Sequence, residues 1–240
     1  MMGILDRRQK CRKLIQRYYR GPSREELLDS TAAALARPSD VLLDAGCGAD
    51  FPLLSRYGPK VAFAVGVDLC SPAPNVLGRT KVIVGNLESL PIRSQSVDLI
   101  VSRSVVEHLD HPVETFKEFG RVLRSGGRLV FTTPNKYYYS CLVALLTPGW
   151  LKDVYFQKVF GGDAYAHFPV RYRANTARAS RDLARVTGFE LTRTEAIEHY
   201  PYYLMFSPAL FRLGILYDEI VRALGFTQLQ STWLVVMEKK

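Results

Sequence analysis

Continuously apolar runs alternate with helical stretches from about residue 24 to residue 134, and this rhythm constrains the fold more than any other feature. The sequence predicts strands at 41–43, 61–67, 81–84, 98–102 and 128–133. Each has a continuous apolar run and does not alternate with polar residues, which is typical of strands buried on both faces. The pattern therefore predicts an α/β fold, a doubly wound and mostly parallel sheet with helices on both sides.

Capping residues mark where the helices between these strands begin and end. Ser23 followed by Glu26 resembles a capping box, which predicts a helix running to about residue 36. His111-Pro112 opens a second helix, which Ser125-Gly126-Gly127 stops. After Pro134 the rhythm gives way to segments rich in aromatic residues and glycine. The remaining expected elements are helices at 176–187 and 208–224 and strands at 189–196 and 232–238.

The domain organisation follows from this change of rhythm. We expect a basic helical segment at 1–37 and one domain at 38–240, with insertions at about 135–175 and 197–228. A chain of 240 residues that is 48% hydrophobic is long enough for one such domain and short for two.

Positive charge is concentrated at the N-terminus. The chain carries a net charge of +9, but residues 1–24 hold eight basic side chains and one acidic one, +7 in total, which leaves +2 for the rest. Residues 4–19 place apolar side chains at helical spacing between the basic ones, which predicts an amphipathic helix. It could be a lid over a cleft, a contact with a membrane surface, or a nucleic-acid grip. Nucleic acid is the least favoured, because the remaining chain is nearly neutral and shows no nucleic-acid-binding motif.

Other compositional signals favour a cytoplasmic protein. The four cysteines form no C-x-x-C pair and no zinc-like spacing, which fits reduced thiols. The start of the chain meets charged residues at once and has no apolar signal region, and the run CLVALL at 141–146 is too short to span a bilayer. The oligomeric state is not indicated.

The loop after the first strand, in VLLDAGCGAD at 41–50, carries the chemistry. Gly46 and Gly48 allow the main chain to approach a ligand closely. A dinucleotide fingerprint needs a third glycine, which is missing, and the carboxylates of Asp44 and Asp50 would repel a pyrophosphate. A cation is favoured instead. S-adenosylmethionine fits, because it carries a sulfonium and an ammonium and no phosphate.

Two further segments follow strands at the same edge of the sheet. Asp68 ends the second strand, 20 residues after Gly48, where a carboxylate can accept both hydroxyls of a ribose; nicotinamide sites use the same arrangement. Asn86-Leu87-Glu88 follows the third strand, where Asn86 can meet an adenine amino group and Leu87 can pack on the ring.

Four motifs in order resemble the class I S-adenosylmethionine-dependent methyltransferases of the type 11 group. They are DAGCG, VGVD, GNLESLPIRSQSVDLIVSRSVVEHLDHP and FGRVLRSGGRLVFTTPN, within about residues 40–135. The resemblance implies a Rossmann-like seven-stranded sheet whose last strand is reversed, with helical insertions that cap the acceptor. The implied cofactor residues are Asp44, Gly46, Cys47 and Gly48 at the methionine part, Asp68 and Leu69 at the ribose, Asn86, Leu87 and Glu88 at the adenine, and Ser102 and Arg103 at the methyl-transfer site.

The chain departs from this family pattern at two positions. Members usually have a glycine at Asp50 and an aspartate at Asn86. The segment 102–108 is also similar to quinone-biosynthesis O-methyltransferases, some of which use E-x-x-E-H as a metal site. Here Ser104 replaces the first glutamate, so we expect no metal.

The expected reaction is methyl transfer to a small acceptor, with oxygen favoured over other atoms. His108, just past the fourth strand, is the candidate base, and the alternative is that it only anchors its loop. Aromatic insertions indicate a lipophilic, quinone-like or sugar-like acceptor, and His167, His199, Arg171 and Arg173 are secondary candidates for contacting it. A catalytically silent binding protein of the same fold and a nicotinamide-dependent oxidoreductase are the alternatives.

Overall fold

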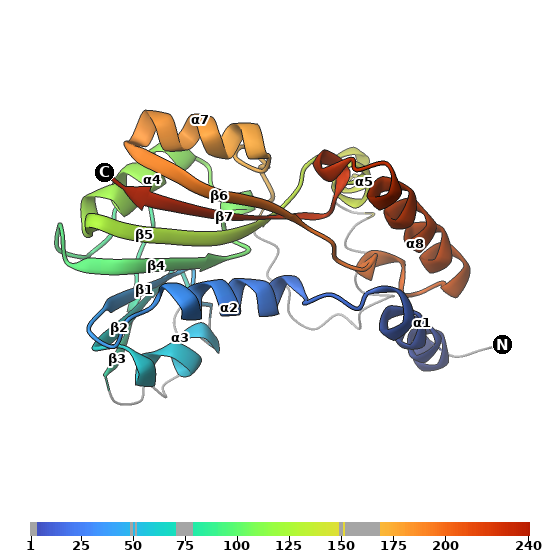
Figure 1. Cartoon of the computed structure of the whole chain (residues 1–240), viewed down its shortest axis with the longest axis horizontal. Coiled ribbons are helices and arrows are strands. Elements are labelled where there is room, and N and C mark those ends of the chain that lie inside the picture. Colours follow the sequence, from blue (N-terminus) through green and yellow to red (C-terminus); the bar gives the residue numbers. More distant parts are fainter. Residues whose placement is uncertain (1–3, 49, 51, 71–78, 149–150, 152–168) are drawn as a thin grey trace. The chain divides into compact units, whose positions relative to one another are not determined.

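The computed structural model describes residues 4–48, 50, 52–70, 79–148, 151 and 169–240 (Figure 1). The chain divides into two compact units. The first, called the sheet unit, comprises Glu25–Thr133, Val170–Glu195 and Trp233–Lys240. The second, called the helical unit, comprises Met1–Arg24, Pro134–Pro169 and Ala196–Thr232. The helical unit includes the N-terminal helix and most of the two segments that the sequence suggests as insertions, whereas residues 170–175 belong to the sheet unit.

Seven strands form one sheet in the order β3-β2-β1-β4-β5-β7-β6. The strands from β3 to β5 are mutually parallel, whereas β7 runs in the opposite direction between β5 and β6 (Figure 1). This confirms the expected fold class. The bounds are β1 Val41–Ala45, β2 Phe63–Asp68, β3 Thr80–Val84, β4 Val97–Arg103, β5 Leu123–Pro134, β6 Phe189–Ile197 and β7 Thr232–Lys239.

Strand order reverses at β1, and this reversal locates the ligand edge. The chain runs outward from β1 through β2 to β3 and then crosses over to β4 on the other side of β1. In open α/β sheets, ligands bind beyond the carboxyl ends of the strands at such a reversal. The segments after β1, β2, β3 and β4 are therefore the first places to look for a site.

Helices cover both faces of the sheet. In Figure 1, α4 and α7 lie together on one side, and α2 and α3 lie on the other. Phe116 of α4 fills the layer between helix and sheet, because its ring lies 5.6 Å from that of Phe131 on β5. The bounds are α2 Arg24–Leu35, α3 Pro52–Tyr57, α4 Pro112–Val122 and α7 Ala177–Thr187, with short 3-10 turns at Gly58–Lys60 and Val106–His108.

The fifth strand differs from its sequence expectation. We expected Ser125-Gly126-Gly127 to separate a helix from a strand at 128–133, but the strand starts at Leu123 and includes these residues. Its pairing with β4 jumps from Val97↔Leu123 to Leu99↔Arg128, which is a bulge. Gly126 accommodates the bulge with a φ of 72°, so the glycines bend this strand and do not end it.

The helical unit contains α1 Ile4–Tyr18, α5 Tyr139–Leu146 and α8 Pro208–Ala223, with 3-10 turns at Tyr202–Leu204 and Thr227–Leu229. α1 packs on α8 and buries Cys11 against Phe211 and Ile215. The expected helices at 4–19 and 208–224 are thereby confirmed, while α5 was not expected. Within the described part of the chain, no helix is long and apolar enough to cross a bilayer.

A buried carboxylate ties the elements of the helical unit together. The carboxylate of Asp218 on α8 accepts hydrogen bonds from Tyr19, which follows α1, and from Tyr138, which precedes α5. Burial raises the pKa of Asp218 to about 6, although these two hydrogen bonds act to lower it. Asp218 therefore holds three segments of the unit that are distant in sequence.

Candidate cofactor site

The loop after β1 is shaped by two glycines in the left-handed region. Gly46 has a φ of 81° and Gly48 a φ of 68°, values that other residues adopt only with strain. A Cβ at Gly46 would lie 2.2 Å from Val105 Cγ2, so the protein itself requires this glycine. Among the described residues, no atom would lie within 4 Å of a Cβ at Gly48. The backbone at Gly48 is thus open to a ligand.

Asp44, near the end of β1, is a buried carboxylate without a partner among the described residues. Its side chain is 1% exposed, and neither oxygen accepts a hydrogen bond from any described residue. Burial raises the pKa of Asp44 to about 7; the positive charge of Arg103 opposes this rise, and the nearby Asp68 adds to it. A buried, unsatisfied acceptor is costly unless something pairs with it. A cationic donor such as an ammonium group would satisfy it.

Asp68, at the end of β2, closes the loop by accepting two main-chain hydrogen bonds. One oxygen accepts from the N–H of Gly48 at 2.8 Å and the other from the N–H of Cys70 at 2.9 Å. Leu69, which lies between Asp68 and Cys70 in the sequence, is 60% exposed. Each carboxylate oxygen has a second lone-pair site, so Asp68 can still accept from the hydroxyls of a ribose.

Cys47 packs the loop against the neighbouring strand β2. Its thiol is buried, and burial together with the charges of Asp44 and Asp68 raises its pKa to about 12. A Cβ at Gly66 on β2 would lie 2.7 Å from the sulfur of Cys47, so the side chain packs directly on the neighbouring strand. Cys47 is an inert packing residue of the loop, and its neutral thiol places no further charge beside Asp44.

The segment after β3 turns on itself and is attached to the start of α4. The side-chain oxygen of Asn86 accepts from the N–H of Glu88 at 2.9 Å. Leu87, between these two residues in the sequence, is buried. A carboxylate oxygen of Glu88 accepts from the N–H of His111 at 3.2 Å. Asn86 itself is exposed. This arrangement presents a short polar side chain and one apolar neighbour, as an adenine ring would need.

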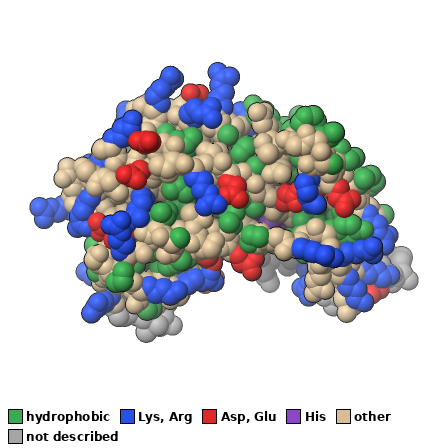
Figure 2. Space-filling model, in the orientation of Figure 1, with side chains coloured by type: hydrophobic (Ala, Val, Ile, Leu, Met, Phe, Trp, Pro, Cys, Tyr) green, Lys and Arg blue, Asp and Glu red, His purple; other side chains and the backbone are tan. Residues whose placement is uncertain are grey.

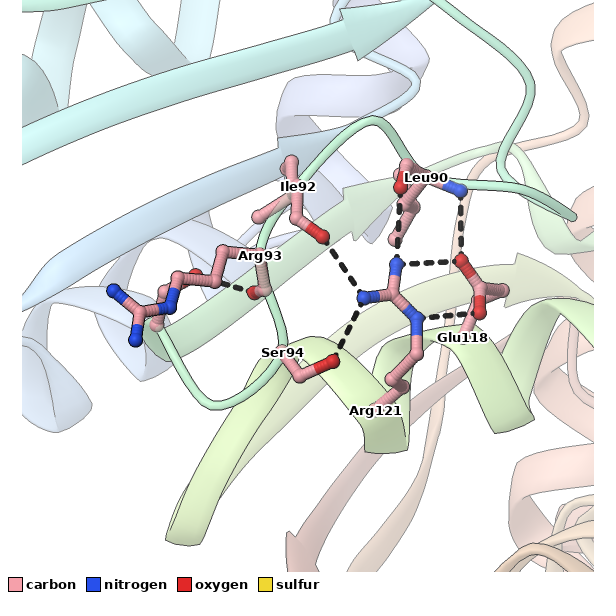
Figure 3. A network of polar contacts seen from close by, with 7 residues as sticks. Leu90, Ile92, Arg93, Ser94, Glu118 and Arg121 are labelled. Atoms are coloured by element: carbon pink, nitrogen blue, oxygen red, sulfur yellow. Dashed lines mark hydrogen bonds and ion pairs between the residues drawn. The ribbon is translucent and has the colours of Figure 1, made fainter.

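A glutamate and an arginine on α4 hold the rest of the same loop, an arrangement that the sequence did not suggest (Figure 3). Arg121 forms a bidentate pair with Glu118, with N–O distances of 2.7 and 2.8 Å. Its guanidinium also donates to the main-chain oxygens of Leu90 and Ile92, and Glu118 accepts from the N–H of Leu90 at 2.8 Å. Arg121 therefore positions the segment that contains Asn86.

Removal of the Arg121 guanidinium should loosen residues 86–94, the segment that is expected to receive the adenine and is called the adenine segment, without unfolding the sheet. The Arg121→Gln variant is expected to weaken binding of S-adenosylhomocysteine by roughly tenfold, comparable to losing one hydrogen bond to a charged group. Arg124→Gln is the matched control, because Arg124 pairs with Asp98 and makes no hydrogen bond to residues 86–94 among the described residues. Calorimetry of both variants with the same ligand tests the expectation. Equal affinities would contradict a positioning role for Arg121.

The end of β4 brings two more expected residues to the loop. Ser102 is buried, and its hydroxyl donates to the main-chain oxygen of Ala45 at 2.8 Å. Arg103 lies close enough to Asp44 to lower the pKa of that carboxyl against the effect of burial. The chain then turns at Ser104, whose φ is 56°, into the 3-10 turn that contains His108. His108 is half-buried.

A buried polar cluster lies next to His108. Glu107 is 5% exposed and accepts from Thr133 at 3.4 Å, while the amide of Asn175 donates to the same threonine. The expected helix at 176–187 is confirmed as α7, which Thr176 caps by accepting from the N–H of Ala179. The main-chain oxygen of Glu107 accepts from the N–H groups of Arg171 and Tyr172. These contacts fix the turn that carries His108.

Other candidates from the sequence lie elsewhere or are already engaged. Arg171 pairs with Asp110 at 2.8 Å, and Arg173 donates to the main-chain oxygen of Asp110, so both side chains contact a surface loop of the protein. In the helical unit, the ring of His199 stacks on Tyr200, with 4.3 Å between ring centroids. His167 lies outside the described residues.

An open hollow of about 640 Å³ lies at the other end of the sheet. Its lining consists of Arg93, Ser94, Gln95, Ser96 and Arg124. These residues precede β4 or begin β5, whereas the glycine loop follows the carboxyl end of β1. The loop site is therefore defined by its chemistry and its place in the topology, and this hollow plays no part in it.

The residues at the carboxyl ends of β1 to β4 fit S-adenosylmethionine. Asp44, buried and unpaired among the described residues, would suit its amino group, and Gly48 leaves room for close approach of a ligand. Asp68 and Asn86 supply acceptors at successive strand ends. Over the described part of the chain, no three His, Cys, Asp or Glu side chains gather as a metal site would require. The fold and this acidic loop define a protein of the class I methyltransferase architecture.

Comparisons with known proteins agree with this class. Residues 43–131 match the family model described as "Methyltransferase domain". A Mycobacterium tuberculosis protein, "Probable S-adenosylmethionine-dependent methyltransferase Rv3030", is 35% identical over 103 residues, 41% of this chain and 37% of the relative. A malonyl-[acyl-carrier protein] O-methyltransferase of Marinomonas is 32% identical over 103 residues, 40% of this chain and 38% of the relative. Residues 43–131 thus match a methyltransferase domain, and this part of the chain is similar to S-adenosylmethionine-dependent methyltransferases.

Solved structures share the fold over nearly the whole chain. A S-adenosylmethionine-dependent methyltransferase from Mesorhizobium loti has a TM-score of 0.58 and 17% identity, over 88% of this chain and 100% of that one. The [4+2]-cyclase SpnF has a TM-score of 0.57 and 16% identity, over 92% and 85%. Sequence similarity to the curated relatives, by contrast, spans only about two fifths of their length. The common element is the sheet with its cofactor loop.

Proposed function

We propose that the protein is an enzyme that transfers the methyl group of S-adenosylmethionine to an oxygen of a small lipophilic, quinone-like or sugar-like acceptor. The observation that supports it best is the buried, unpaired carboxylate of Asp44 beside the open glycine loop. A site built for pyrophosphate would offer N–H donors and positive charge there. This site offers a carboxylate, which suits a cation.

The cofactor brings an activated methyl on a sulfonium, so the protein's own task is to bind and orient. Asp44 would accept from the amino group, Asp68 from the ribose, and the Asn86–Glu88 segment would receive the adenine. Ser102 and Arg103 lie at the end of β4 next to this loop, where the acceptor would approach. Correct alignment and exclusion of water are the main sources of rate in such a displacement.

Oxygen as the methylated atom is the finer part of the proposal. Several relatives of the matched domain are named malonyl-[acyl-carrier protein] O-methyltransferases. Tyrosines and leucines are abundant in the segments outside the matched domain, which favours an acceptor with an apolar or flat part. A cytoplasmic location is part of the same proposal, and cell fractionation tests it.

Two measurements separate this function from its rivals. Calorimetry with S-adenosylmethionine and with NADH should show binding of the first ligand and none of the second, and preference for NADH would favour an oxidoreductase. Formation of S-adenosylhomocysteine should then be followed over a panel of hydroxyl and carboxyl acceptors. Tight cofactor binding without turnover on any acceptor would favour a catalytically silent protein, and the [4+2]-cyclase shows that this fold is not confined to methyl transfer.

His108 is proposed as the base that receives the acceptor's proton. The His108→Ala variant is expected to lose about 100- to 10,000-fold in kcat, the usual range for a positioned acid–base group, with an unchanged affinity for S-adenosylhomocysteine. The matched control is His111→Ala, because His111 caps α4 through its main chain and makes no side-chain cap bond. Unchanged turnover in His108→Ala would leave His108 as an anchor of its turn.

A further inference from the structure

The outer face of α8 is apolar where a surface helix is normally polar. Leu213, Leu216, Ile220 and Leu224 recur at helical spacing, and between 49% and 61% of each side chain is exposed. The opposite face of the same helix, which includes Phe211, is buried in the core of the helical unit. α8 therefore carries apolar side chains both on its buried face and on its outer face. Exposed apolar surface of this extent marks a contact with another body.

α5 extends this apolar face. The ring of Tyr139 on α5 packs edge-on against Tyr217 of α8, with 5.0 Å between centroids, so the two helices adjoin. Val143 and Leu145 are more than half exposed, and Leu146 is 85% exposed. Figure 2 shows hydrophobic side chains gathered over α8 and α5, at the upper right. We call this surface, formed by the exposed side chains of α8 and α5, the apolar face.

Exposed basic side chains lie on α1, the helix that packs against the Phe211 and Ile215 side of α8. α1 packs on α8, and the exposed side chains of Lys10, Arg12, Lys13 and Arg17 project from it. Arg212, exposed on α8, is close enough to Cys11 of α1 for its charge to lower the pKa of that thiol against the stronger effect of burial. Asp6 is the only acidic residue among the first 24, so the sequence of this segment supplies almost no compensating charge.

We infer that the helical unit carries a docking surface for an anionic lipid bilayer, formed by the apolar face and the basic side chains of α1. Leucine and isoleucine side chains enter the boundary between headgroups and acyl chains, while lysine and arginine remain at the level of the anionic headgroups. A nucleic acid would use the charge but would leave the aliphatic face exposed. A second copy of the chain would cover the aliphatic face but would gain nothing from the charge.

Co-sedimentation of the full chain with vesicles tests this inference without cofactor or acceptor, so its outcome is independent of the proposed methyl transfer. The protein should pellet with vesicles of phosphatidylcholine plus phosphatidylglycerol, more weakly with phosphatidylcholine alone, and less as salt is raised. The double variant Leu213→Gln/Ile220→Gln should lose roughly tenfold or more in partitioning. The variant Arg12→Gln/Lys13→Gln should lose several-fold on anionic vesicles only.

Matched controls come from α7 of the sheet unit. Val186 is 56% exposed, as the α8 residues are, and Arg178 and Arg185 are exposed basic residues. Val186→Gln and Arg178→Gln/Arg185→Gln should therefore pellet as the wild type does. As a second readout, the emission of Leu216→Trp should shift to shorter wavelength on anionic vesicles, and that of Val186→Trp should not.

Four results would overturn the inference. The first is a wild type that pellets with neither kind of vesicle. The second is a loss in Val186→Gln equal to that in Leu213→Gln/Ile220→Gln. The third is a dimer in light scattering that Leu213→Gln/Ile220→Gln dissociates, which would assign the apolar face to a second copy. Binding to duplex DNA that depends on Arg12 and Lys13 alone would assign α1 to nucleic acid.

Discussion

The Asp44→Asn variant is expected to be more stable than the wild type near neutral pH and to bind the cofactor poorly. The pKa of Asp44 is about 7 in the folded protein, compared with 3.8 for the unperturbed group. Between these values the folded state keeps a proton that the unfolded state has released. The free energy of unfolding therefore falls as pH rises through this window, by about 1.4 kcal/mol per pH unit and by roughly 4 kcal/mol at most.

Asparagine keeps the shape of the side chain and never ionises. The free energy of unfolding of the variant therefore does not fall through ionisation at this position. Urea unfolding of the cofactor-free protein should show a higher free energy of unfolding for Asp44→Asn than for the wild type at about pH 8, and similar values at about pH 3, below both pKa values. Asp50→Asn is the control for stability, because Asp50 is an exposed carboxylate in the same loop. Asp218 also has a raised pKa, so the readout is the difference between the two proteins. A difference that stays constant between these limits would show that Asp44 is ionised in the folded protein.

Cofactor binding should change in the opposite direction. An ammonium group pairs with the ionised carboxylate, and loss of a charge-assisted hydrogen bond typically weakens binding by roughly 10- to 100-fold. The affinity of the wild type for S-adenosylhomocysteine should rise with pH up to about 7, because Asp44 must release its proton first. Calorimetry in buffers of different ionisation enthalpy should detect that proton. Asp44→Asn should show neither the pH dependence nor the proton release, and equal affinity in both proteins would remove Asp44 from the site.

The sheet could be read from the sequence because its strands are short, apolar and separated by strong stop signals. The strands from β1 to β4 end within about two residues of their expected limits. The two helices that the sequence did not indicate lack such signals. α3, at Pro52–Tyr57, is only six residues long, and α5 is apolar on every side, so it shows no helical contrast between polar and apolar residues.

The candidate site could be read only in part, because the missing information lies in contacts between distant segments. The types and spacing of Asp44, Gly46 and Gly48 indicate a cationic ligand. Arg121 forms hydrogen bonds with residues of the adenine segment that lie 27 to 31 positions away in the sequence, and no local pattern predicts these contacts. Burial of Asp44, which sets its pKa, likewise depends on the neighbouring strands and not on the loop sequence.

The two glycines of the loop should respond differently to the same added methyl group. Both have positive φ, so either alanine variant incurs backbone strain of about 1–2 kcal/mol. At Gly46 the new Cβ would also lie 2.2 Å from Val105 Cγ2, and overpacking of this kind adds roughly 1–3 kcal/mol. Gly46→Ala is therefore expected to lower the free energy of unfolding by about 2–5 kcal/mol. Gly48→Ala should lose only the strain.

A second substitution separates the steric part from the strain. Val105→Ala removes Cγ2 and leaves Val105 Cβ as the nearest atom of that side chain, at 3.3 Å. In the Gly46→Ala background it should restore part of the lost stability, whereas in the wild type it should only destabilise. Urea unfolding of the four proteins gives the coupling free energy, which should fall within the usual 0.5–3 kcal/mol for residues in contact. A coupling of zero would mean that the loop moves away from Val105 without cost.

Cofactor affinity should then reverse the order of the two glycines. A Cβ at Gly48 would lie within 4 Å of no described atom, so if the ligand crosses the loop there, the methyl group of Gly48→Ala occupies its path. Gly48→Ala should accordingly weaken binding of S-adenosylhomocysteine far more than its small stability loss suggests, by tenfold or more. The double variant Gly46→Ala/Val105→Ala should bind more tightly than Gly48→Ala despite being less stable. If Gly48→Ala instead binds like the wild type, the ligand does not pass over this loop, and the site has to be sought at another strand end.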